Sequence, residues 1–168
     1  YDFLNKKLDN NFSDNIPIKN YIHIHLDEKW FSKLYINSYK DINPTYEQFL
    51  NFIKLVVTKN NLLITTGLIN FIFFDKLKNN FFNKKSEKIY FQNINGNKIY
   101  LVYKPSFDDI ESLLRNSTTL VSCHGAVTHA ANSFDVKIID IVDENKVKFY
   151  NKYTAYLKNY DRVFRSSF

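Results

Sequence analysis

The chain is poor in several residue types, and their scarcity limits what it can be. It has no methionine, one cysteine, three glycines and three prolines among 168 residues. One cysteine excludes an internal disulfide and fits a reducing compartment. No run of 18 or more apolar residues occurs, which excludes a membrane-spanning helix, and residues 1–15 lack the apolar core of a signal peptide. We therefore expect a cytoplasmic protein, and the missing initiator methionine leads us to expect a segment before Tyr1.

The composition that remains is sufficient for one compact domain, because 45% of the residues are hydrophobic. The net charge is +6, from 23 basic and 17 acidic side chains. A basic surface favours an anionic partner such as a nucleotide, a nucleic acid or an acidic lipid. A general enrichment in Lys and Asn explains the same charge without any partner, because no basic block stands out.

Hydrophobic patterns along the chain alternate between strand-like and helical segments. Strand-like runs cover 21–27, 61–67, 118–123 and 136–142. Helical spacing is found at 44–60, 68–82, 107–115 with Ser106 as its N-cap, 126–134 and 145–160. Asn95-Gly96 between two further strand-like runs predicts a β-hairpin. The pattern predicts one α/β domain over 20–168, a mainly parallel sheet covered on both faces with a β-hairpin insertion, while 1–19 are a linker or packing segment.

The few glycines are informative, because average usage would place about a dozen in a chain of this length. Gly96 fits the hairpin turn, and Gly67 and Gly125 each follow a strand-like run and precede a helical one. In an open α/β sheet such positions lie at the carboxyl ends of strands, where ligands bind. We therefore expect a ligand near Gly67 or Gly125.

The turn at Gly125 has two interpretations. The helix that follows begins with Ala126 and carries Thr128 and His129 in its first turn. Backbone N–H groups at that helix start can hold a diphosphate, with His124 or His129 donating to it. Alternatively, the small residues only let the helix pack closely on the sheet. The residues alone do not decide between these readings.

The histidines and the cysteine also suggest a thiol nucleophile or a metal site. Cys123 beside His124 invites a thiol-nucleophile hypothesis, a cysteine hydrolase. Consecutive strand residues point to opposite faces, so we favour a small buried cysteine. His23 and His25 share a face, but no third ligand stands at a suitable spacing, so we predict no metal site.

The segment SCHGAVTHAANSFDVKIIDIV resembles the donor-binding segment of ADP-heptose:lipopolysaccharide heptosyltransferases, which are glycosyltransferases of the GT-B fold with two Rossmann-like halves. The family pattern is roughly Asp-Ser-Gly-x-x-His-x-Ala-Ala. His124-Gly125-Ala126 fall on its first triplet, His129 on its histidine and Ala131 on an alanine, although a histidine replaces the family's acid. VYKPSFDDIESLLRNSTTLVSC is similar to the preceding family helix and strand, and HIHLDEKWF to its strand and Lys-Arg-Trp loop.

The resemblance implies the Rossmann-like, nucleotide-sugar-binding half of a transferase in polysaccharide biosynthesis. It implies a nucleotide-sugar donor, a glycan or lipid-linked acceptor, contact with an anionic membrane, and an upstream half that supplies the general base. It implies no cofactor and no metal. The residues that it assigns to the donor diphosphate are His124, Gly125, Ala126, Thr128, His129 and Lys29. Those that it assigns to the nucleotide base are Tyr103, Lys104 and Pro105. The alternative is a non-catalytic basic α/β module that binds RNA or nucleotide.

Overall fold

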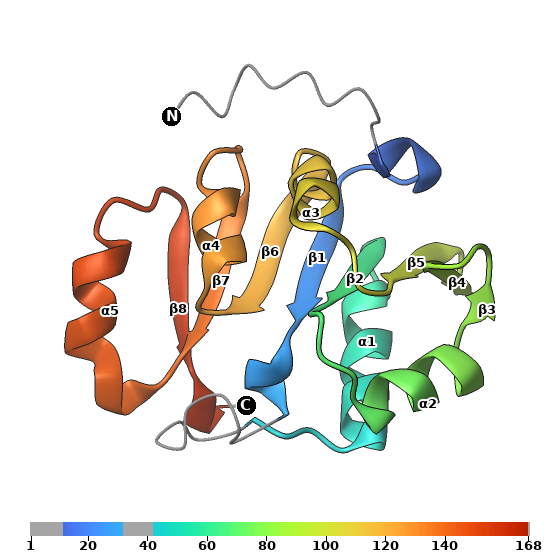
Figure 1. The fold of residues 1–168 in the computed structure, drawn as a ribbon, viewed down its shortest axis with the longest axis horizontal. Helices are drawn as coiled ribbons and strands as arrows, with labels where there is room; N and C mark the ends of the chain where they lie inside the picture. Colours follow the sequence, from blue (N-terminus) through green and yellow to red (C-terminus); the bar gives the residue numbers. More distant parts are fainter. Residues whose placement is uncertain (1–11, 32–41, 168) are drawn as a thin grey trace.

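The computed structural model describes residues 12–31 and 42–167, in which eight strands form one sheet of order β3-β4-β5-β2-β1-β6-β7-β8 (Figure 1). The strands are β1 (Tyr21–Leu26), β2 (Leu62–Thr66), β3 (Asn83–Lys84), β4 (Ile89–Ile94), β5 (Asn97–Val102), β6 (Ser117–Cys123), β7 (Lys137–Val142) and β8 (Tyr160–Phe164). The α-helices are α1 (Tyr46–Val57), α2 (Ile72–Asn80), α3 (Phe107–Leu114), α4 (Ala126–Ala131) and α5 (Val147–Thr154). Short 3-10 helices are η2 (Phe12–Asn15), η3 (Glu28–Trp30), η4 (Glu144–Lys146) and η5 (Arg165–Ser167).

The order of the parallel strands identifies the fold class. Strands β5, β2, β1, β6, β7 and β8 run parallel, and β4 and β3 are antiparallel to their neighbours. Counted along the chain, the parallel strands stand in the order 3-2-1-4-5-6, which is the Rossmann order. The predicted α/β, Rossmann-like class is therefore confirmed. The strand order reverses between β1 and β6, and at such a switch point ligands bind outside the carboxyl ends of the strands.

Helices cover both faces of the sheet, because successive strand residues point to opposite sides and both sides are apolar. Helices α1 and α2 share one core with β1, β2 and β6. Its members include Ile24, Phe49, Ile53, Leu77 and Val121. Helices α3 and α4 share a second core with the opposite side of β6 and β7. Its members include Ile110, Leu114, Leu120, Val127 and Ile138.

Two local signals in the sequence produce the structures that they predict. The Ser106 Oγ accepts a hydrogen bond of 3.1 Å from the Asp109 amide and caps α3. Asn95 and Gly96 have φ angles of 51° and 85°, and two positive values are what a two-residue type I′ hairpin turn requires. The hairpin that they close is continuous with the main sheet, because β5 also pairs in parallel with β2.

The two ends of the described chain differ in part from the predicted pattern. The helix expected over 145–160 covers only Val147–Thr154, and the alternating segment after Asn159 forms β8. Near the start, the Ser13 amide donates to Ser112 Oγ on α3, and Ile16 is buried. Residues 1–11 of the expected linker lie outside the described ranges. None of the helices in 12–31 and 42–167 has the length and apolar character needed to cross a membrane.

A row of polar side chains crosses the sheet. Thr65, His25, Ser122 and Asp140 occupy paired positions on β2, β1, β6 and β7, so they point to the same face. All four are buried. Strands covered on both faces are normally apolar, and burying polar groups is costly unless they are hydrogen-bonded. This polar row therefore has to be satisfied from within the protein.

The two histidines of β1 share one hydroxyl at the end of the polar row. His23 Nε2 lies 2.8 Å and His25 Nδ1 2.9 Å from Thr65 Oγ1. A hydroxyl offers one proton, so one histidine accepts from Thr65 and the other donates to it. Burial lowers the pKa of His23 to about 3 and that of His25 to about 4, with further lowering by His25 and by Lys29 respectively. Both rings are neutral in the folded protein near neutral pH.

We expect these histidines to make the fold sensitive to acid. Above pH 6.5 they are neutral in both states, and below it the unfolded chain binds protons that the folded chain resists. Stability therefore falls from about pH 6.5 towards pH 4, by up to about 1.4 kcal/mol per pH unit for each histidine. Urea unfolding at a series of pH values measures the slope, which should be smaller in His23→Phe. The exposed Lys98, changed to Gln, serves as the control because this change removes no histidine, and an unchanged slope in His23→Phe would contradict the expectation.

Candidate functional site

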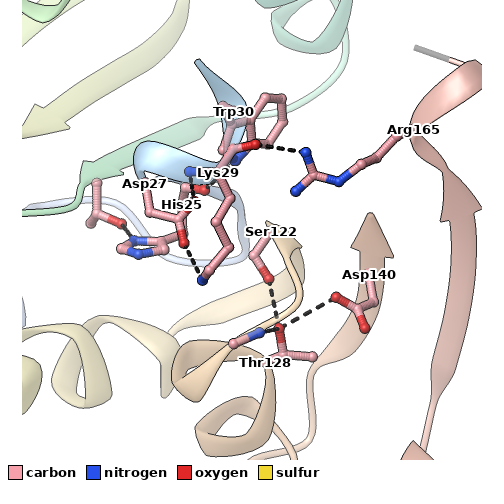
Figure 2. Close-up of polar contacts among 10 residues, drawn as sticks. His25, Asp27, Lys29, Trp30, Ser122, Thr128, Asp140 and Arg165 are labelled. Atoms are coloured by element: carbon pink, nitrogen blue, oxygen red, sulfur yellow. Dashed lines mark hydrogen bonds and ion pairs between the residues drawn. The ribbon is translucent and has the colours of Figure 1, made fainter. Parts of the chain in front are cut away.

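The switch point carries a charged pair that follows β1 directly. Asp27 caps η3 by accepting the Lys29 amide at 3.1 Å, and its other oxygen accepts the Lys29 ammonium at 2.7 Å (Figure 2). The indole N–H of Trp30 donates to the His25 carbonyl at 2.9 Å. The Arg165 guanidinium, after β8, donates to the Lys29 carbonyl at 2.8 Å. Lys29 is thus held by its side chain and by its backbone at the carboxyl end of the sheet.

Both members of the Asp27–Lys29 pair are largely buried, with side-chain exposures of 8% and 13%. Burial raises the pKa of Asp27, and the nearby Lys29 charge opposes that effect. Burial disfavours the charged form of Lys29, but the Asp27 carboxylate outweighs it, so the pKa of Lys29 is raised overall. The ammonium is therefore retained near neutral pH, as one half of an ion pair with the Asp27 carboxylate.

The Lys29 ammonium reaches across to the turn that follows β6. A Cβ atom placed on Gly125 would lie 2.7 Å from Lys29 Nζ, closer than a side chain tolerates. Gly125 therefore leaves room for the ammonium, and β1 and β6 contribute to one site. Lys29 and Gly125 were both predicted as site residues from separate segments of the sequence, and the structure brings them together.

His124, the residue before this glycine, is fixed by a buried carboxylate of the neighbouring strand. Its Nδ1 lies 2.7 Å from Asp140 Oδ2, and the Tyr160 hydroxyl donates to the same oxygen at 2.9 Å. Burial raises the pKa of Tyr160, and the Asp140 charge raises it further, so the phenol stays a donor. The other oxygen, Oδ1, accepts from Thr128 Oγ1 at 3.5 Å.

His129 lies beside His124, as the prediction requires. The two rings are 5.0 Å apart in an edge-to-face arrangement, and His129 Nδ1 lies 2.6 Å from the Tyr156 hydroxyl. Burial lowers the pKa of His129, and His124 lowers it further. The two histidine rings therefore pack together beside the Gly125 turn, where Ala126 is exposed.

The expected backbone cradle at the start of α4 needs correction. Thr128 is fully buried, and its hydroxyl accepts the Gly125 amide at 3.2 Å and contacts Ser122 Oγ at 3.1 Å (Figure 2). Neither the Thr128 hydroxyl nor the Gly125 amide is offered to a ligand in this arrangement. Helix α4 has only six residues, so its dipole is weak. Thr128 therefore orders the turn, and the cation beside Gly125 is the Lys29 side chain.

The residues assigned to the nucleotide base lie on the same edge, after β5, and β2 separates them from β1. The Tyr103 hydroxyl donates to Asn70, and the Lys78 ammonium lies 3.7 Å from its ring centroid. One ring face of Tyr103 is thereby occupied. Lys104 has a φ of 50° and its amide donates to Thr66. Pro105 is buried, so little of its ring is accessible to a ligand.

The structure separates Cys123 from the histidines, as its strand position predicts. Cys123 is buried in the core shared with α1, and burial raises the pKa of its thiol. His124 instead turns towards Asp140. The geometry therefore gives no support to a thiol nucleophile.

Among the described residues no group of three or more His, Cys, Asp or Glu side chains could hold a metal ion.

Four important residues were not singled out from the sequence. They are Asp27, Asp140, Tyr160 and Arg165. A signal existed for Asp140, because an acid inside the apolar run 136–142 is rarely buried without a partner. Asp27 directly follows a predicted strand, which places it at the ligand-binding edge. For Tyr160 and Arg165 the sequence held no signal, since β8 was not predicted there.

Comparison with known proteins leaves the family open. No protein-family model matches the chain, and no curated protein matches it. The resemblance to heptosyltransferases therefore stays a prediction, while the Rossmann-like fold is a property of the structure itself.

Cys123 should be chemically inert in the folded protein. Its thiol is 2% exposed and has a raised pKa, so little thiolate is present to react. We expect no reaction with a chromogenic disulfide reagent in native buffer over the time in which the guanidinium-unfolded chain reacts fully. Absorbance of the released thiol measures both, and rapid native labelling would restore the cysteine-nucleophile hypothesis.

Proposed function

We propose that this domain binds the nucleoside diphosphate of a nucleotide sugar and belongs to a glycosyltransferase. The observation that carries the proposal is the convergence at the switch point. Lys29 lies in one segment that resembles the family, and His124-Gly125 lie in another. Strands β1 and β6 are paired, and the Lys29 ammonium lies against Gly125. Rossmann-like sheets bind nucleotides at this edge.

In the proposed reaction the bond from the sugar C1 to the diphosphate breaks, and its electron pair leaves with the diphosphate oxygen. The acceptor hydroxyl forms the new bond to C1, and its proton passes to a general base that we place in an upstream half. The acceptor is a glycan or a lipid-linked sugar. Lys29 stabilises the negative charge of the leaving diphosphate, the role that a metal has in other transferases, and His124 and His129 contact the diphosphate or the neighbouring sugar.

The pairing of Lys29 with Asp27 is compatible with binding of an anion. The ammonium has three donor hydrogens, and the Asp27 carboxylate keeps the group charged and in place. Arg165 anchors the carbonyl of the same residue, so the site does not have to reorganise before the diphosphate arrives. Electrostatic sites that are organised in advance stabilise leaving groups most effectively.

Titration calorimetry with ADP, UDP, GDP and CDP tests the proposal. We expect at least one of these to bind the wild-type protein. Lys29→Gln should weaken that binding about tenfold or more, because a hydrogen bond to a charged group contributes about 1.5–3 kcal/mol. His129→Ala should weaken it as well.

The matched control is Lys98→Gln, because Lys98 is an exposed lysine at the opposite end of the sheet, near the start of β5. It should leave nucleotide affinity unchanged. Thermal unfolding of each variant separates lost binding from lost folding. Tight binding that is equally insensitive to Lys29→Gln and His129→Ala would place the nucleotide elsewhere. Binding of oligonucleotides with a steep salt dependence, and of no nucleotide, would favour the basic RNA-binding module.

We also propose that α5 supplies the contact with an anionic membrane. Phe149 and Tyr153 are 53% and 43% exposed, and their rings lie 4.6 Å apart on one side of the helix. Lys148 and Lys152 are exposed beside them, and residues 145–158 contain four lysines and no acid. Aromatic side chains flanked by lysines suit the interface of a membrane with acidic lipids.

Co-sedimentation with vesicles tests this contact. We expect binding to vesicles that contain phosphatidylglycerol, with less binding as salt rises, and none to pure phosphatidylcholine vesicles. Replacing Phe149 and Tyr153 by serine should abolish it. Leu55, which is 73% exposed on α1, gives the control Leu55→Ser. Equal binding to both kinds of vesicle, or loss in the control, would contradict the assignment of this surface.

A further inference from the structure

Asp140 is a buried acid on β7. Two of its hydrogen-bond donors, His124 and Thr128, lie in the turn after β6 and in the helix that follows it. It has no exposed surface, and it receives hydrogen bonds from His124, Tyr160 and Thr128. A buried carboxylate is expensive unless it is fully hydrogen-bonded, and three donors from three separate elements satisfy it. An apolar side chain is usual at such a position in a parallel strand that is covered on both faces, so the carboxylate of Asp140 requires a specific explanation.

We propose that Asp140 is a positioning residue that fixes the ring of His124 and so leaves Nε2 as the nitrogen that meets the ligand. This inference rests on the proposed function for the identity of the ligand. As a carboxylate, Asp140 only accepts hydrogen bonds, so Nδ1 of His124 carries a proton. With the proton on Nδ1, Nε2 carries a lone pair, which can accept a hydrogen bond from a sugar hydroxyl of the ligand but not from a phosphate oxygen.

The contacts of His124 support this assignment. Its Nε2 has no hydrogen-bond partner among residues 12–31 and 42–167, and its side chain is 13% exposed. The Tyr150 ring on α5 packs against the imidazole at 4.9 Å, and the His129 ring packs edge-on at 5.0 Å. Two rings and one carboxylate therefore define both the plane and the rotation of the imidazole.

The same carboxylate orders the glycine turn through Thr128. Thr128 Oγ1 donates to Asp140 Oδ1 and accepts the Gly125 amide. The amide oxygen in Asp140→Asn keeps the contact with Thr128, while the amide NH2 group replaces the oxygen that faces His124, so this variant tests the His124 contact alone. A carboxylate that orients a histidine fixes its tautomer, and partners of this kind contribute strongly to function without touching the substrate.

Nitrogen-resolved NMR of the imidazole rings tests the positioning directly in the unliganded protein. We expect His124 in the wild type to carry a proton on Nδ1, hydrogen-bonded to Asp140. In Asp140→Asn the proton should redistribute towards Nε2, because the amide can itself donate. A His124 ring protonated on Nε2 alone in the wild type would overturn the proposal. The wild-type measurement requires neither a nucleotide nor a variant.

A double-mutant cycle tests the consequence for binding. Asp140→Asn and His124→Ala should each weaken nucleotide binding about tenfold, and the double variant should be no weaker than His124→Ala alone, because Asp140 acts through His124. A purely structural role predicts losses that add. Lys98→Gln, at the exposed lysine near the opposite end of the sheet, is the control and should leave affinity unchanged. Additive losses would overturn the proposal.

The two experiments separate this inference from the proposed function. If the wild-type protein binds none of the four diphosphates, the proposed function fails, while the NMR result still decides whether Asp140 fixes the tautomer of His124. If nucleotide binds and the cycle is additive, the function stands and the positioning role fails.

Discussion

The carboxylate of Asp140 is the interaction on which the rest of the site depends. It lies where four strands have replaced apolar side chains by polar ones, and it gathers donors from the turn after β6, from α4 and from β8. Removing any one of these donors leaves a buried negative charge less satisfied, which is a heavy penalty in a dry interior. The polar row therefore acts as a constraint on geometry more than as a source of stability.

The charges at the switch point satisfy one another in the protein itself. Asp27 pairs with Lys29, Arg165 binds the backbone of the same lysine, and Asp140 binds His124. The site is ordered in advance and its charges have been desolvated during folding. A phosphate group arriving there would find donors already oriented, and its binding would lose little free energy to rearrangement.

The sequence predicted the fold better than it predicted the site, and the reason is physical. Strand and helix periodicity is local, so the alternation of elements, the Ser106 cap and the Asn95-Gly96 turn were accessible. Gly125 was found because it stands where a strand-like run ends, and Lys29 was found only through the resemblance of HIHLDEKWF to the family's strand and loop. Asp140, Tyr160 and Arg165 act through contacts between strands far apart in the chain, and no local pattern encodes such contacts. Helix signals also overstated α4 and α5, because small and amphipathic residues continue past the point where packing ends the helix.

The hydrogen bond from Arg165 to the Lys29 carbonyl joins residues 136 positions apart. It can form only when β8 is paired with β7, and it is a contact of high sequence separation, a kind of contact that slows folding. The Lys29 side chain has its partner Asp27 two residues away, whereas its carbonyl is held from the far end of the described sequence. The ends of β1 and β8 are consequently coupled, although no local sequence signal connects them.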